Sequence, residues 1–101
     1  MKVVFSRNAD RDLEGIGDWI AEDNPERAVS FVIELREACR TIGASPRGHP
    51  LVDGSRDATL RRKVYGNYLI FHDVGPNAVE ILHILHGARD YAQIIFPGEP
   101  E

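Results

Sequence analysis

LRRKVYGNYLIFHDVGPNAVEILHILHGAR, residues 60–89, is the stretch of sequence that decides the fold. It contains three runs rich in β-branched and aromatic residues, which is typical of strands. Gly66-Asn67 separates the first two runs and has the length and composition of a hairpin turn. Gly75-Pro76-Asn77 separates the second run from the third. The last run should be central in a sheet, because both of its faces are largely apolar. We therefore expect strands at Leu60–Tyr65, Tyr68–Val74 and Val79–His86.

The N-terminal half is predicted to form one strand followed by two helices. Residues 2–6 are a short β-branched run. Apolar positions then recur at helical spacing over residues 7–23, and again over residues 25–42. Asn24-Pro25 between them is a typical helix start, because proline at the first helical position loses no hydrogen bond. Gly43 stands where a left-handed residue often ends a helix.

Together these elements predict one α+β domain in the order β-α-α-β-β-β. A helical hairpin with one apolar side needs a sheet to cover, so we expect a two-layer sandwich with the hairpin packed on a mainly antiparallel sheet. The domain should span residues 1–96. Residues 44–59 are rich in proline and glycine and should form an ordered surface loop, and residues 97–101 should form a flexible C-terminal tail.

The composition favours a small globular protein with little bulk attraction for nucleic acid. The net charge is −4 over 101 residues, so electrostatics alone would not hold the chain on DNA or RNA. The charge is uneven, however, because residues 56–63 carry four cations and one anion. No apolar run approaches the roughly 20 residues that span a bilayer. We expect no membrane contact and a cytoplasmic location, which also suits a lone cysteine, Cys39.

The residue types that usually carry chemistry are not arranged for it. His83 and His86 are three positions apart in a predicted strand, so their side chains should point to opposite faces. No Cys/His/Asp cluster has the spacing of a metal site. Cys39 belongs to an apolar helical stripe, where a thiol behaves as a small hydrophobe. We therefore expect no metal and no cofactor.

A basic group on the predicted strands is the first candidate functional surface. Strand alternation places Arg61, Lys63 and Tyr65 on one face of the sheet, with the neighbouring residues on the other. Arg61 and Lys63, with Arg89 just after the last strand, are expected to converge near Tyr68 and His86. Contact with phosphates or an acidic partner is one interpretation. A solubilising face with a structural salt bridge to Arg89 is the other, and the composition leaves both open.

The order and spacing of these motifs resemble those of the RelE/ParE toxin superfamily over about residues 3–96. Members are toxins of type II toxin–antitoxin pairs, each neutralised by a small antitoxin that wraps the toxin surface. The matching residues are Ala9-Asp12-Leu13-Ile16-Trp19-Ile20-Ala21, Asn24-Pro25-Ala28, Leu60-Arg61, Tyr68-Leu69-Ile70-Phe71 and Ile81-Leu82-Ile84-Leu85-His86-Gly87-Ala88-Arg89-Asp90.

Two positions favour the ParE-like branch of that superfamily over the RelE-like branch of ribosome-dependent mRNA endonucleases. Leu69 stands where the resemblance implies an arginine in a RelE-like nuclease, and an apolar side chain cannot stabilise a developing negative charge. Phe96 stands about where a RelE-like tyrosine would be, without the hydroxyl needed for proton transfer. Tyr91 is the one substitute, which keeps the nuclease alternative open. Its catalytic residues would be Arg61, Lys63, Arg89 and Tyr91.

The ParE-like resemblance implies a toxin that acts by binding rather than by catalysis. It implies a ParD-like antitoxin as partner and DNA gyrase as target, with nucleic acid involved only indirectly through these proteins. A toxin without remaining activity is a third alternative. The candidate residues for binding the antitoxin or the target are Trp19, Arg61, Lys63, Tyr68, His86 and Arg89.

Overall fold

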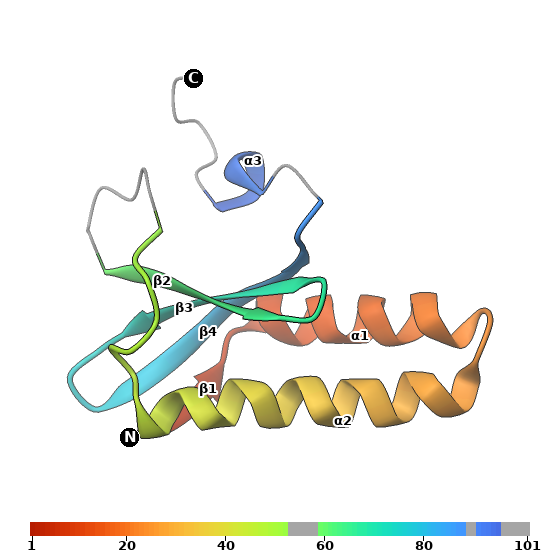
Figure 1. Ribbon diagram of the computed structural model, residues 1–101, viewed down its shortest axis with the longest axis horizontal. Helices are drawn as coiled ribbons and strands as arrows, with labels where there is room; N and C mark the ends of the chain where they lie inside the picture. The colour runs from red at the N-terminus through yellow and green to blue at the C-terminus, as the bar shows by residue number, and fades with distance from the viewer. Residues whose placement is uncertain (53–58, 89–90, 96–101) are drawn as a thin grey trace.

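The computed structural model describes residues 1–52, 59–88 and 91–95, and within them the expected α+β sandwich is confirmed (Figure 1). The sheet has the strand order β1-β4-β3-β2. β1 pairs with β4 in parallel, and the other neighbours are antiparallel. The elements are β1 (Lys2–Phe5), α1 (Arg7–Ala21), α2 (Pro25–Thr41), the 3₁₀ helix η1 (Ile42–Ala44), β2 (Leu60–Tyr65), β3 (Tyr68–Val74), β4 (Ala78–His86) and α3 (Ala92–Ile95).

The two long helices begin at side-chain caps and lie antiparallel along one face of the sheet (Figure 1). The Ser6 hydroxyl accepts a hydrogen bond from Ala9 N–H at 3.0 Å, and the Asn24 side chain accepts one from Arg27 N–H at 3.0 Å. Each cap satisfies a backbone donor that the first helical turn leaves unpaired. Pro25 follows as the first helical residue, as its fixed φ predicts.

Two apolar clusters lie on opposite faces of the sheet. The larger one fills the space between the sheet and the helical hairpin, and it includes Leu13, Leu35 and Ile81. The smaller one lies on the far face around Phe71 and Leu85, where Tyr91 and α3 pack against it. Since β4 contributes to both clusters and lies between β1 and β3, the prediction that it is a central strand is confirmed.

A register shift in the β3–β4 ladder changes which face each β4 residue presents. Phe71 pairs with His83, but the next residue of β3, His72, pairs with Ile81. Leu82 is therefore the extra residue of a β-bulge. The bulge puts Ile81 and Ile84 on the same face, although they are three positions apart. Simple alternation along this strand did not predict this arrangement.

The conformation of Gly43, just after the second long helix, differs from the sequence prediction. Gly43 does not adopt the left-handed conformation expected of it, and it lies inside η1. A glycine is needed there for space, because a Cβ at this position would lie 2.2 Å from the backbone oxygen of Met1. The left-handed glycine is Gly66, with φ of +58°, in the predicted hairpin turn.

Candidate functional site

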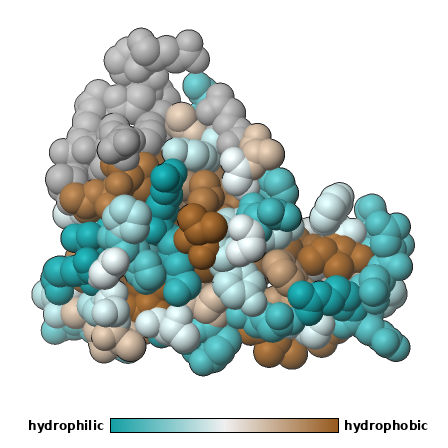
Figure 2. Space-filling view, in the orientation of Figure 1, coloured by the Kyte–Doolittle hydropathy of each residue, from teal (hydrophilic) through white to brown (hydrophobic). Residues whose placement is uncertain are grey.

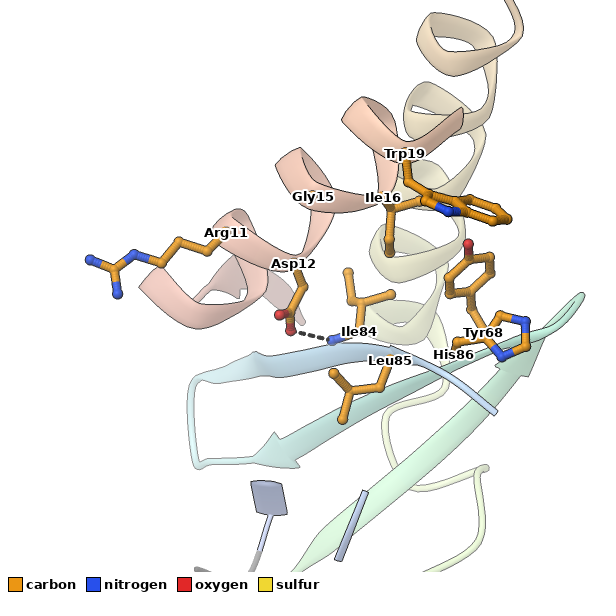
Figure 3. A pocket seen from close by; sticks show the side chains of 9 residues that line it. All are labelled: Arg11, Asp12, Gly15, Ile16, Trp19, Tyr68, Ile84, Leu85 and His86. Atoms are coloured by element: carbon orange, nitrogen blue, oxygen red, sulfur yellow. Dashed lines mark hydrogen bonds between the residues drawn. The ribbon is translucent and has the colours of Figure 1, made fainter. Parts of the chain in front are cut away.

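A groove of about 570 Å³ opens between α1 and the ends of β3 and β4 (Figure 3). Its volume lies within the range of pockets that bind ligands. Three of the predicted binding residues, Trp19, Tyr68 and His86, meet here although they come from three different elements. The lining residues are Arg11, Asp12, Gly15, Ile16, Trp19, Tyr68, Ile84, Leu85 and His86.

The α1 wall of the groove follows from helical spacing. Asp12, Gly15, Ile16 and Trp19 are three or four residues apart and share one side of the helix. Gly15 contributes no side chain, and a Cβ there would meet nothing within 4 Å, so this part of the wall is open. Trp19 is 65% exposed, so most of its indole is available to a ligand or partner at the mouth of the groove.

The sheet wall of the groove is built around the Tyr68 ring. Phe31 packs on the ring at 5.6 Å between centroids, and His86 meets it edge-on at 5.4 Å. Burial raises the pKa of Tyr68 above its ordinary value, so the phenol keeps its proton at neutral pH. In Figure 3 the Tyr68 hydroxyl points toward the Trp19 indole.

His86 lies at the end of the groove with its tautomer set by a neighbour. Its Nδ1 accepts a hydrogen bond from Ala88 N–H at 3.1 Å. When the imidazole is neutral, its proton is therefore on Nε2, which is a donor. Ile16 and Ile84 supply apolar surface between these polar groups.

Asp12 ties the inner end of the groove to β4. Its Oδ2 accepts hydrogen bonds from Ile84 N–H at 2.9 Å and from the His83 ring at 2.8 Å. An acidic residue on an amphipathic helix usually belongs to its solvated face. The signal that distinguishes Asp12 is its position in the same helical stripe as Ile16 and Trp19.

The predicted basic patch does not form around this groove. Arg61 pairs with His72 and Lys63 with Ile70, whereas Tyr68 pairs with Tyr65 at the hairpin end of β2. The guanidinium of Arg61 donates to the carbonyl oxygen of His49 at 2.7 Å and so holds the loop beside β2. The convergence of Arg61 and Lys63 on Tyr68 and His86 was therefore a wrong prediction. Arg89 lies outside the described residues.

Lys63 belongs to a second, shallower groove between α2 and β2. This groove has a volume of about 520 Å³ and is also lined by Ile33, Glu37 and Tyr65. Ile33 and Val29 on α2 are 62% and 64% exposed. Figure 2 shows that apolar side chains also reach the surface among polar ones over the sheet and the helical hairpin.

Three residues of the alternative nuclease site are described, and they lie on different faces of the sheet. Arg61 and Lys63 share the helix-facing side of β2 with Tyr65, which packs against Phe31 of α2. Tyr91 lies on the far face, where its ring contacts Phe71 at 5.1 Å. The Tyr91 hydroxyl accepts a hydrogen bond from Arg62.

Leu69 and Phe96 were the two positions that favoured the ParE-like branch. Leu69 packs against the far-face cluster, as an apolar side chain should. Phe96, like Arg89, falls outside the described residues.

Sequence reasoning did not single out His72, a buried histidine of β3 that pairs with Arg61 of β2. His72 is fully buried, and burial lowers its pKa to about 4. Its Nδ1 lies 3.3 Å from the carbonyl oxygen of Ile70, while its Nε2 has no hydrogen-bond partner. The His49 ring meets it edge-on at 5.6 Å. Within the described ranges, no group of three His, Cys, Asp or Glu residues could hold a metal ion.

A family model described as the ParE toxin of the type II toxin–antitoxin system parDE matches residues 3–91. The chain belongs to this ParE toxin family. A solved chain of the chromosomal ParDE toxin–antitoxin system from P. aeruginosa has the same fold, with a TM-score of 0.75 and 20% sequence identity. The similarity covers 85% of this chain and 95% of that one. The curated protein sequences include no match.

These comparisons confirm the predicted resemblance and the predicted ParE-like branch. The helices that the structure describes include none long and apolar enough to cross a membrane. The candidate functional site of this ParE-family chain is therefore sought among surfaces that could bind another protein. The groove at Trp19 is the leading candidate, because it combines apolar area with an indole N–H and a phenol hydroxyl that donate to no described residue.

Proposed function

We propose that this chain is the toxin of a ParDE pair that inhibits DNA gyrase by binding and is neutralised by a ParD-like antitoxin. The observation that carries the proposal is the ParE family match over residues 3–91. The cytoplasm is the compartment in which such a toxin would meet gyrase.

A mechanism without chemistry at the toxin is supported by the positions of the candidate catalytic groups. A general acid and the cations that stabilise a transition state must reach the same reacting phosphate. Tyr91 and the pair Arg61 and Lys63 lie on opposite faces of the sheet. Arg61 is also engaged by a loop carbonyl. Binding therefore accounts for the arrangement of these side chains better than RNA cleavage does.

The proposal is tested with purified gyrase and purified toxin. We expect the toxin to reduce supercoiling of relaxed plasmid and to increase the fraction of plasmid trapped as a cleaved gyrase complex. Addition of the antitoxin before gyrase should restore supercoiling. Normal supercoiling with toxin in large excess would contradict the gyrase assignment.

A translation extract with an added reporter mRNA separates binding from cleavage. We expect no toxin-dependent cuts in the mRNA. Cuts that disappear in Tyr91→Phe would instead establish the nuclease alternative and contradict the proposed mechanism.

A further inference from the structure

The second half of β4 has an open backbone edge. β1 pairs with β4 only from Ala78 to Ile81, whereas β3 pairs with β4 as far as His86. The chain leaves the sheet after β1 and enters α1. Among the strands that the structure describes, residues 82–86 therefore have a neighbour on one side and none on the other.

Two side chains occupy the start of this edge in place of a strand. The Ser6 hydroxyl donates to Leu82 C=O at 2.9 Å, and the Asp12 carboxylate accepts from Ile84 N–H at 2.9 Å. Both bonds satisfy backbone groups that β1 would have paired if it continued. Such capping is one way in which native proteins protect a strand edge.

The capping stops at Ile84, and the edge then enters the groove. Because Ile84 N–H points to Asp12 and strand backbones alternate, the backbone groups of Ile84 and His86 face the same side. The next residue, Gly87, donates instead to Asn67 C=O in the turn before β3. Within the described part of the chain, Ile84 C=O and His86 N–H have no partner at this edge. The Ile84 carbonyl and the His86 N–H are thus an exposed acceptor and donor two residues apart, which is the spacing at which one strand pairs with another.

Side chains around this edge offer both apolar contact and hydrogen bonds. Ile16, Ile84 and the rings of Trp19 and Tyr68 form the apolar walls of the groove (Figure 3). No described residue accepts a hydrogen bond from the Trp19 indole N–H or from the Tyr68 hydroxyl. At sites where an extended segment adds to a sheet, backbone hydrogen bonds supply affinity and pockets for alternate side chains supply specificity.

We propose that the groove binds an extended segment of the antitoxin, which adds to the sheet along Ile84–His86 and inserts one large apolar side chain between Trp19 and Tyr68. This inference rests on the proposed function, because it takes the antitoxin as partner. A free extended segment suits the site better than a folded enzyme surface, because its backbone donors and acceptors are unpaired along its whole length, whereas most backbone groups of a folded protein are already hydrogen-bonded.

The backbone component is tested by a matched pair of variants, His86→Pro and His86→Ala. Both remove the imidazole, but only proline removes the N–H at the open edge. The N–H of residue 86 faces away from β3, so proline leaves the β3–β4 ladder bonds intact. We expect His86→Pro to bind the antitoxin at least tenfold more weakly than His86→Ala. Equal affinities of two folded variants would overturn the proposal.

Hydrogen exchange of the wild-type toxin gives a second readout that needs no proline variant. The His86 amide should exchange quickly in the free toxin and slowly in the antitoxin complex. Protection of the helical hairpin without any change at His86 would place the antitoxin elsewhere and overturn the proposal.

Trp19 reports on the side-chain component, because it is the only tryptophan in the chain. Binding of a tryptophan-free antitoxin should shift its emission to shorter wavelength. Trp19→Ala should weaken binding at least tenfold, whereas Val29→Ala, an equally exposed apolar position on α2, should leave it within twofold. Equal effects of the two variants would contradict the assignment.

The same titrations separate this inference from the proposed function. Tight wild-type binding that is unaffected by Trp19→Ala and His86→Pro would overturn the groove assignment and leave the toxin–antitoxin pair intact. Failure of the wild-type toxin to bind the antitoxin would overturn both. Variants that keep antitoxin binding but lose gyrase inhibition would assign the groove to gyrase and overturn the proposal.

Discussion

At the scale of single residues, the described part of the chain contains one buried side-chain polar atom without a hydrogen-bond partner. His72 is fully buried beside His49, Arg61 and Lys63, and its Nε2 makes no hydrogen bond. The loss of hydration on burial disfavours a charged imidazole most, and the two neighbouring cations disfavour it further. The histidine is therefore neutral in the folded state at every pH at which the protein is expected to work.

The buried histidine predicts that stability falls in mild acid. The unfolded chain protonates His72 below its ordinary pKa of 6.5, while the folded chain resists protonation until about pH 4. Between these values the unfolded state binds more protons, so the free energy of unfolding decreases as pH falls, by roughly 3 kcal/mol in full. His72→Leu should remove most of this decrease in urea titrations at pH 7, 6 and 5. His86→Ala, which changes an exposed histidine, should keep it, and identical pH profiles of wild type and His72→Leu would contradict the assignment.

Individual residues also show where sequence reasoning was sufficient. The alternation of Arg61, Lys63 and Tyr65 on one face of β2 was predicted, because it depends only on the twofold period of a strand. Their separation from His86 was not, because it depends on pairing register. The sequence predicted that Gly43 is needed for a left-handed conformation, whereas it is needed for space. Sequence reasoning missed this for a similar reason, because the backbone of Met1 that crowds Gly43 is distant in sequence.

At the scale of elements, the contact between α1 and β4 creates the groove, and Asp12 fixes that contact. Its carboxylate joins α1 to the strand directly after the bulge, through Ile84 N–H and His83. Sequence periodicity predicted the helix and the strand but not the bulge at Leu82, because both faces of this strand are largely apolar and the change of phase that an extra residue causes is therefore hidden. The groove was consequently not predicted, although three of its residues were.

Removal of the Asp12 carboxylate should therefore destabilise the protein. Asp12→Ala leaves Ile84 N–H and the His83 ring without their acceptor, and hydrogen bonds to charged groups contribute about 1.5–3 kcal/mol. Asp10→Ala on the same helix removes only a loose exposed contact to Arg36 at 3.5 Å, so it should change stability by less than about 0.5 kcal/mol. Urea unfolding of the two variants gives the comparison. Equal stabilities would mean that the packing of α1 alone sets its position.

At the scale of the whole molecule, the distribution of charge supports a toxin that acts through proteins. The net charge of −4 opposes accumulation on DNA. Several cations are also engaged within the fold, because Arg27 pairs with Glu34, Arg40 lies near Glu37, and Arg61 binds a loop carbonyl. A DNA-coating protein instead presents unpaired cations along one face.

The free toxin should therefore not retard duplex DNA in a gel at about 0.15 M salt, even at micromolar concentration. Non-specific binding to DNA depends on the release of counterions by clustered lysine and arginine side chains, and its dissociation constants are about 10⁻⁴ to 10⁻⁶ M even in proteins built for it. A toxin with an excess of carboxylates should be weaker still. Retardation that weakens steeply with added salt would show that the toxin contacts phosphates directly. In that case, the first substitutions should be made at the basic residues of β2 rather than in the Trp19 groove.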